Sequence, residues 1–493
     1  MPSILNWSPA QLQRAAVWTT ASAAIGGLAL LLGGAIAIGF YAVPALLVAL
    51  LLGGVFLQLP DRYALLMLMV VVLFVQGAVG YYTGFTKISW LAYGLAGLFA
   101  VKFVTKLFDS RPQTGAGFAG WMWALLAFAS IAGIGLLINR PALAQLIAGL
   151  KNQFPFWMVA LYLPLAGLND ADWRAIWRLM LIVLVCQVPF VFHQHFFIAA
   201  GRSVMGWDAV VGTFGGNPEA GGLNAVMVLF CIISFALALN LYLRQQLSGR
   251  HFSALLVCLL LVILLGEVKA AFFWLPVAIL LVFGRAILRS PVKLLLASAG
   301  IAVFVLGVGF VYEKLYWKDV PQRGLAENAE HSFDYFFDPN LIVRETGEVS
   351  RGAALALWAK DPQHDIYSVL LGRGIAASME GAISRGEVAQ RYYPYHIGAT
   401  ALAILLWDYG VLGTLAYLSI LLLALVSLFR QLRPGQADPV RHAYLSTALI
   451  ALVLVVLTIP YNSTLMNEPA TQLLVALACG YAAWGSKRKQ NDA

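Results

Sequence analysis

Charged residues are scarce in this chain, and their scarcity excludes an ordinary soluble fold. Only 11% of the residues are Asp, Glu, Lys or Arg, whereas 61% are hydrophobic, and the mean hydropathy is +0.81. Soluble domains carry about 25% charged residues. Runs of roughly twenty apolar residues recur instead, each long enough to cross about 30 Å of hydrocarbon. The composition therefore predicts an all-α, polytopic membrane protein.

Cysteine is also rare, and its placement argues against disulfides and metal clusters. The four cysteines lie inside apolar runs and show no CxxC spacing. His193 and His195 are two residues apart and would face different sides of a helix. The sequence shows no cluster of metal ligands. We therefore expect a reaction that uses no metal and no cofactor.

A cleavable signal peptide and internal repeats are not apparent either. Residues 1–13 are mostly polar, and the apolar stretch that follows is long enough to remain as an anchor. No period of 20–50 residues and no pair of matching halves stands out. Many secondary transporters contain such repeats with broken helices at corresponding places. The sequence thus disfavours a transporter without excluding one.

Apolar runs separated by polar breaks predict about fourteen membrane spans. We expect them near residues 15–35, 38–58, 63–82, 88–105, 117–137, 153–167, 173–198, 220–243, 253–265, 270–285, 294–312, 396–428, 443–460 and 468–485. A cytoplasmic N-terminus makes alternate loops consistently basic, as the positive-inside rule requires. The formal charge of +9 is then explained by membrane topology and not by nucleic-acid binding. Both termini are expected in the cytoplasm.

One long polar segment interrupts the predicted helices. It divides the chain into a bundle of about eleven spans (1–312), an extracytoplasmic loop (313–395) and a C-terminal part of about three spans with a basic tail (396–493). The loop holds 21 of the 55 charged residues. Connections this long usually carry a function. Because ATP is not expected outside the cytoplasm, a synthetic reaction there needs a donor that is already activated.

Two candidate elements precede the loop on the same side of the membrane. The first is GTFGGNPEAG (212–221), in which Asn217 and the glycines either form a tight turn or let backbone amides approach an anion. The second is the turn that contains Glu267 and Lys269. These two residues either pair with each other, or Lys269 provides a point charge for phosphate while Glu267 tunes it.

Two more candidate elements belong to the loop. Arg351 is expected in the first turn of a helix, where it binds a diphosphate in bidentate fashion or forms a surface ion pair with Glu345 or Glu348. A glycine turn around Arg373 follows. The second element is the segment Arg391-Tyr-Tyr-Pro-Tyr-His396.

A helix starting near His396 would hold its imidazole at the membrane surface, and histidine is suited to accept a proton from a sugar hydroxyl. The alternative is that Tyr395 and its neighbours anchor the boundary and that the histidine is structural. Asp408 would lie about 18 Å along the helix, at about 1.5 Å per residue, too deep to share this site.

Together these elements resemble the O-antigen ligase and Wzy polymerase superfamily of bacterial surface glycans. The resemblance covers roughly residues 212–415 and rests on motifs in the family's order, namely GTFGGNPEAGGLNA, GEVKAAF, SRGAALALW with LLGRG, and YHIGATALAILLWDYGVLG. It implies a metal-independent glycosyltransferase that uses an undecaprenyl-diphosphate-linked oligosaccharide as donor. Arg351 matches the arginine that binds diphosphate, and His396 matches the histidine proposed to activate the acceptor hydroxyl.

The resemblance favours a polymerase of O-antigen or exopolysaccharide repeat units in the bacterial inner membrane, with its long loop in the periplasm. Lys269 stands where ligases often carry the arginine of a Ser-Arg-Gly turn, so it keeps the positive charge but loses the planar fork. His396 and Arg351 are the predicted catalytic residues. The predicted substrate-binding residues are Lys269, Glu267, Arg373, Arg391, Tyr395 and Asn217.

The expected partners are the lipid-linked donor, a glycan acceptor and membrane lipids, with a chain-length regulator as a further candidate. Three alternatives stay open. The first is a ligase that transfers glycan to lipid A–core or another acceptor. The second is a flippase or transporter of lipid-linked glycan. The third is a loop that serves only as a docking platform.

Overall fold

The computed structural model describes residues 51–108, 119–201, 206–219, 221–266, 268–288, 290–315, 333, 336–381, 385–432 and 438–491. The chain divides into two units, Met1–Pro60 and Asp61–Ala493. Residues 51–58 of the first unit are helical. The predicted span 15–35 and most of 38–58 lie outside the described residues.

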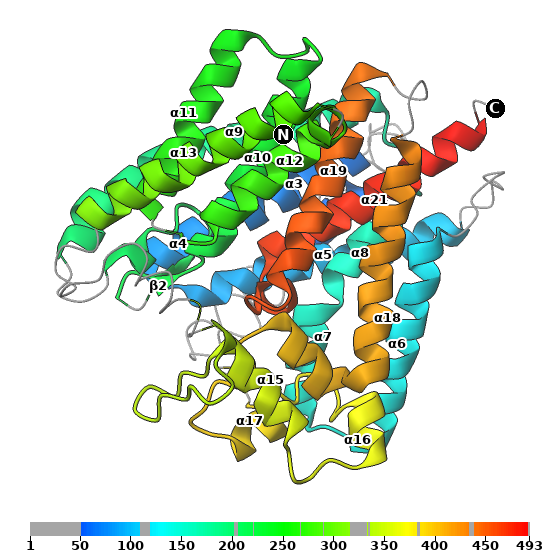
Figure 1. Cartoon of the computed structure of the whole chain (residues 1–493). Helices are drawn as coiled ribbons and strands as arrows, with labels where there is room; N and C mark the ends of the chain where they lie inside the picture. The colour runs from blue at the N-terminus through cyan, green and yellow to red at the C-terminus, as the bar shows by residue number, and fades with distance from the viewer. Residues whose placement is uncertain are drawn as a thin grey trace, which may run out of the picture. The chain divides into compact units, whose positions relative to one another are not determined.

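The second unit is built almost entirely of helices (Figure 1). Its N-terminal half contains α3 (Asp61–Val70), η2 (Val71–Val75), α4 (Gln76–Thr83), η3 (Thr86–Ile88), α5 (Ser89–Phe108), α6 (Gly120–Asn139), α7 (Leu143–Gln153), α8 (Pro155–Tyr162), α9 (Asp170–His193), η4 (Gln194–Ile198), η5 (Ala199–Gly201) and η6 (Gly206–Ala209). Its C-terminal half contains α10 (Asn224–Leu243), α11 (Gly249–Gly266), α12 (Ala271–Leu288), α13 (Pro291–Leu315), α15 (Arg351–Ala359), α16 (Ile366–Leu371), α17 (Glu387–Arg391), α18 (Ala401–Gln431), α19 (Pro439–Thr458), α20 (Thr464–Asn467) and α21 (Pro469–Asn491).

Among the residues described, nine helical stretches are long and apolar enough to cross a membrane. They are Asp61–Thr83, Thr86–Phe108, Gly120–Asn139, Asp170–Ile198, Asn224–Leu243, Gly249–Gly266, Pro291–Lys314, Ala401–Gln431 and Pro439–Thr458. A tenth apolar stretch, Ala271–Gly284, is shorter. The helical class is confirmed, and the apolar helices are consistent with a multi-pass membrane protein; the number of about fourteen spans stays a prediction.

The segment predicted as a span at 153–167 has a different structure. It forms α8, which has eight residues and follows the amphipathic helix α7. At about 1.5 Å per residue, α8 is far shorter than the roughly 30 Å of a hydrocarbon core. Pro155 begins this helix, and turns at Leu165 and Ala166 end it. This segment is therefore not a complete span.

The spans pack in two groups that share α19 and α21. Helix α10 is almost fully buried, because α9, α11, α12 and α19 contact it. Helix α18 packs along α6 on the other side of the unit (Figure 1). The loop helices α15, α16 and α17 gather at one end of α18, at the bottom of the view. The polar loop is thus a folded cap on one end of the helices.

Helix α18 is broken at Gly410, and the loop fills the break. Gly410 has φ 63° and ψ −167°, which interrupts the regular helix. The carbonyls of Trp407 and Asp408, on the N-terminal side of this break, therefore need N–H donors from elsewhere. The N–H of Arg373 donates to Trp407 O at 2.8 Å, and the N–H of Gly374 donates to Asp408 O at 3.0 Å. The loop backbone therefore replaces the missing hydrogen bonds of a membrane helix.

The same loop segment, residues 371–379, is held by side chains from three helices. Asp408 is fully buried, and its Oδ1 accepts the Ser378 N–H at 2.8 Å. From α7, the Gln145 amide donates to Ile375 O at 2.9 Å. From α6, the Asn139 amide donates to Gly372 O at 3.4 Å. Buried amides and carboxylates need such partners, so the contacts fix the loop against the membrane helices.

Candidate functional site

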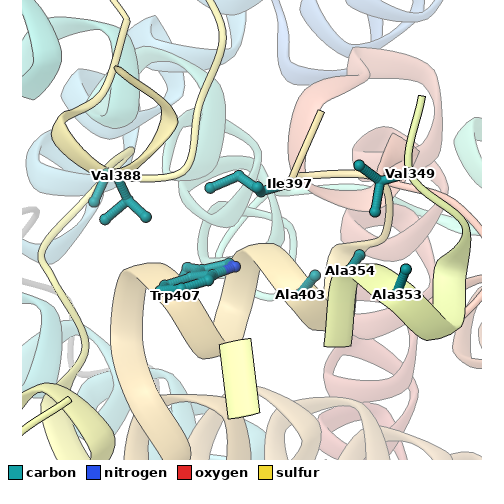
Figure 2. Packing of buried hydrophobic residues seen from close by; sticks show 8 residues of the cluster. Val349, Ala353, Ala354, Val388, Ile397, Ala403 and Trp407 are labelled. Carbon is teal, nitrogen blue, oxygen red and sulfur yellow. The ribbon is translucent and has the colours of Figure 1, made fainter. Parts of the chain in front are cut away.

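The helices of the loop enclose their own small core, to which the start of α18 contributes (Figure 2). Its buried members are Val349, Ala353, Ala354, Ala377, Val388, Ile397, Ala403 and Trp407. In Figure 2, Ile397 lies between Val388 and Val349, with Trp407 on the neighbouring helix. Both ends of the loop are therefore packed into one body. Tyr395 is half-buried against this core and so has a packing role.

His396 is exposed at the edge of this core. It was expected near the start of a helix, but α18 begins at Ala401 with Thr400 as its N-cap, and the residues between are not helical. The N–H of His396 instead donates to Gly347 O at 2.9 Å. The backbone of the loop, and not a helix terminus, therefore fixes the position of His396.

A carboxylate orients the imidazole of His396. Nδ1 of His396 lies 2.5 Å from Oε2 of Glu380, and the two side chains are 55% and 25% exposed. An ionised carboxylate only accepts hydrogen bonds, so Nδ1 carries the proton and Nε2 keeps its lone pair. Such a pair is suited to take a proton from a hydroxyl group. The sequence did not point to Glu380.

Arg351 occupies the first position of α15. The Ser350 hydroxyl caps this helix by accepting the Ala353 N–H at 2.9 Å, and it also donates to Asp338 O at 2.6 Å. Nε of Arg351 donates to Tyr461 O at 3.2 Å, just beyond the end of α19. Its guanidinium lies 5.1 Å from the ring centroid of Phe336. These contacts hold Arg351 where the loop meets the membrane helices.

Lys269 lies in the turn before the helix that packs near Arg351. It is exposed and precedes α12, whose Trp274 packs edge-on against Tyr461 at 5.6 Å between centroids. Tyr461 is the residue whose carbonyl accepts from Arg351. Helix α12, which Lys269 precedes, therefore packs against the residue that binds Arg351. Glu267, the predicted partner of Lys269, lies outside the described residues.

Arg351 and His396 belong to the same part of the loop. Gly347, which binds the N–H of His396, is four residues before Arg351. A Cβ at Gly347, where φ is 73°, would lie 2.2 Å from Pro394 O and 3.6 Å from Cδ2 of His396. Only glycine permits this approach without strain. The segment that contains His396 is therefore bonded to the segment that leads into the helix of Arg351.

Arg373 and Arg391 meet elsewhere in the loop. Both guanidinium groups donate to Gln363, and Arg391 also lies 2.5 Å from Asp361 Oδ2. The side chain of Asp361 is only 1% exposed, so this ion pair is largely removed from water. The contacts give both arginines a role in holding the loop together, and a role in substrate binding stays a prediction.

Asn217 forms a turn in a short hairpin. It ends β1 (Gly216–Asn217), which pairs with β2 (Gly221–Gly222), and its Oδ1 accepts the Glu219 N–H at 2.9 Å. This contact corresponds to the turn interpretation of the motif. The glycines around it have positive φ, as the tight path requires.

The segment before this hairpin, residues 210–215, enters the helix bundle. The Gln194 side chain accepts the N–H of Gly212 at 2.7 Å and donates to its carbonyl at 2.8 Å. Gln187 accepts the Thr213 N–H at 2.8 Å, and the Thr213 hydroxyl donates to Leu73 O at 2.7 Å. Each of these buried polar groups therefore has a hydrogen-bond partner, which a group removed from water requires. The two glutamines are seven residues apart, which places them on one face of a helix. This spacing of polar residues within an apolar run was visible in the sequence.

A comparison with known proteins adds no relative to these contacts. No protein-family model matches the chain, and no curated protein matches it. The interpretation of the site therefore rests on its residues and on the motifs that they form.

Proposed function

We propose that the protein is a membrane glycosyltransferase that polymerises polyprenyl-diphosphate-linked repeat units at the extracytoplasmic face of a bacterial inner membrane. The observation that carries the proposal is the His396–Glu380 pair, 2.5 Å apart, in a segment whose backbone binds Gly347, four residues before Arg351. A base and a cation at the surface of a membrane protein fit a substrate with a hydroxyl group and a lipid-linked diphosphate.

In the proposed reaction, His396 acts on the acceptor hydroxyl, and Arg351 and Lys269 act on the diphosphate of the donor. The acceptor hydroxyl oxygen attacks the anomeric carbon of the donor sugar, and its proton passes to Nε2 of His396. The bond between the anomeric carbon and the diphosphate oxygen breaks, and the electron pair leaves with the lipid diphosphate. Arg351 and Lys269 stabilise the negative charge that develops there, since preorganised positive groups are most effective where charge appears in the transition state.

Glu380 acts as a positioning residue in this scheme. Its carboxylate holds the proton on Nδ1 and stabilises the imidazolium that forms when Nε2 accepts the second proton. Because the side chains of His396 and Glu380 are both partly exposed, a bulky glycan acceptor can approach them. The helices below the loop supply the binding surface for the polyprenyl chain, and proximity then lowers the entropic part of the barrier.

Reconstitution in liposomes with a defined undecaprenyl-diphosphate-linked repeat unit tests the proposal. A ladder of products that grows by one repeat unit at a time supports a polymerase. A single transfer that requires lipid A–core identifies the alternative ligase, which uses the same bond exchange with another acceptor. Movement of the lipid-linked unit across the bilayer with no new glycosidic bond identifies a flippase and overturns the proposal.

A further inference from the structure

A polar cavity lies at the end of the protein opposite to the loop. It has a volume of about 260 Å³ and is lined by Asp170, Trp173, Arg174, Asp438, Val440, Arg441, Tyr444 and Tyr481. Helix α19 begins here and ends at Thr458, three residues before Tyr461, which binds Arg351. Its twenty residues span about 30 Å at about 1.5 Å per residue. The cavity and the loop therefore lie at opposite surfaces of the membrane.

The cavity combines two cations with two anions. Arg174 and Arg441 line it together with Asp170 and Asp438. Asp438 caps α19, because its Oδ2 accepts the N–H groups of Val440 and Arg441 at 3.2 and 3.4 Å. Arg441 is fixed by a 2.6 Å bond from Nη2 to Gly485 O. Its Nε is buried without a hydrogen-bond partner among the described residues. A ligand with one negative and one positive group would match this lining.

The depth of the cavity indicates what kind of ligand reaches it. Two spans, Asp170–Ile198 and Pro439–Thr458, begin at its rim, so it lies at the level of lipid headgroups. Trp173, Tyr444 and Tyr481 form its inner wall, and aromatic side chains of this kind are enriched at membrane interfaces. We propose that the cavity binds the headgroup of a zwitterionic phospholipid with a primary ammonium, namely a phosphoethanolamine lipid.

The lining favours a primary over a quaternary ammonium. A primary ammonium donates hydrogen bonds to Asp170 or Asp438, while the phosphate accepts from the guanidinium groups. A quaternary ammonium has no hydrogen to donate and depends on open aromatic faces. Those faces are partly covered, since Tyr444 stacks on Trp177 at 5.4 Å and Tyr481 stacks on Trp484 at 5.5 Å between centroids.

Lipid titration of the delipidated, full-length protein in detergent tests this site. The unfolding midpoint is followed while short-chain phosphatidylethanolamine, phosphatidylcholine or phosphatidylglycerol is added. We expect phosphatidylethanolamine to stabilise the protein with an apparent Kd roughly tenfold tighter than either other lipid, because it alone combines the phosphate with an ammonium that donates hydrogen bonds. Equal shifts with all three lipids overturn the proposal. An equal shift with soluble phosphoethanolamine overturns the assignment to a lipid.

Two variants with a matched control locate the effect. Arg174→Gln and Asp170→Asn should each remove the preference for phosphatidylethanolamine, measured against the midpoint of the same variant without added lipid. Arg178→Gln removes the same charge one helical turn away, outside the lining, and should retain the preference. A preference that survives in both cavity variants, or that is lost in the control, contradicts the site.

Discussion

Oε2 of Glu380 lies 2.5 Å from Nδ1 of His396, although sixteen residues separate them along the loop. The contact sets the tautomer of the imidazole and leaves Nε2 to accept a proton. It also joins the β-bridge between Glu380 and Arg385 to the segment that leads into α18. The activity of His396 should therefore depend on Glu380.

The first prediction concerns this pair. His396→Ala should lower polymer formation by about 10²–10⁴-fold, the usual contribution of a general base. Glu380→Gln should lower kcat at least about tenfold and leave the KM for the lipid-linked donor unchanged, since the carboxylate acts through His396 and not on the donor. Initial rates with a reconstituted donor measure both effects.

A matched control for this measurement is Glu387→Gln, which removes an exposed carboxylate at the start of α17. It should retain the wild-type rate. Long-chain product from the His396→Ala protein at the wild-type rate would remove His396 from the mechanism.

Arg351 should act on the donor and not on the acceptor. Arg351→Lys keeps the charge but loses the planar fork and the Nε bond to Tyr461 O. We expect the KM for the donor to rise about tenfold to a hundredfold, which corresponds to one lost charge-assisted hydrogen bond. Arg344→Lys, an exposed position in the same loop, should behave as wild type. An unchanged donor KM in Arg351→Lys would argue against diphosphate binding at this residue.

Gly372 should be intolerant of any side chain. Its φ is 76°, and a Cβ would lie 2.4 Å from both C and O of Asp408. Left-handed backbone at a residue other than glycine costs about 1–3 kcal/mol, and the overlap adds to this cost. Gly372→Ala should therefore lower the thermal unfolding midpoint, measured in detergent. Gly94→Ala, an exposed helical site with nothing within 4 Å, should leave the midpoint unchanged or raise it.

The loop should lose stability in mild acid because of His364. This side chain lies between the rings of Trp358 and Trp407, at 5.3 and 5.8 Å. Burial lowers the pKa of His364, with a further lowering by Arg373 and Arg391 that Asp361 and Asp365 oppose. The unfolded chain therefore binds more protons than the folded protein. Stability should fall as the pH drops through the ordinary histidine value of about 6.5 towards the lower folded pKa.

Thermal unfolding of the wild type and of His364→Gln between pH 8 and pH 5 measures this effect, at roughly unit steps around the histidine value. The wild type should lose more stability than the variant over this window. Identical pH dependence of the two midpoints would contradict the role of His364.

Hydropathy predicted the spans well where a helix is apolar along its whole length and has no break. The predicted segments at 220–243 and 443–460 correspond to α10 and α19 within a few residues. The break of α18 could not be predicted, because Gly410 lies in an apolar run and its consequence depends on a distant loop. The short helix α8 was also hidden, since its eight apolar residues resemble part of a span.

The candidate site was predictable in part. The motifs around Arg351 and His396 indicated where the loop returns to the membrane. Nothing in the sequence indicated that Glu380 contacts His396, because irregular segments have no period that relates residues sixteen positions apart. Tyr461 was equally hidden, since its contact with Arg351 uses a backbone carbonyl, which every residue has.

The dependence of α18 on the loop has a consequence for biogenesis. The carbonyls of Trp407 and Asp408 accept from the N–H groups of Arg373 and Gly374, which precede them in the chain and lie in the polar segment. During folding, the polar segment must pack against α18 before these donors can reach the two carbonyls. Helix α18 therefore reaches its mature shape only after the loop has folded, and a folding defect in the loop should expose a broken apolar helix that quality-control proteases recognise.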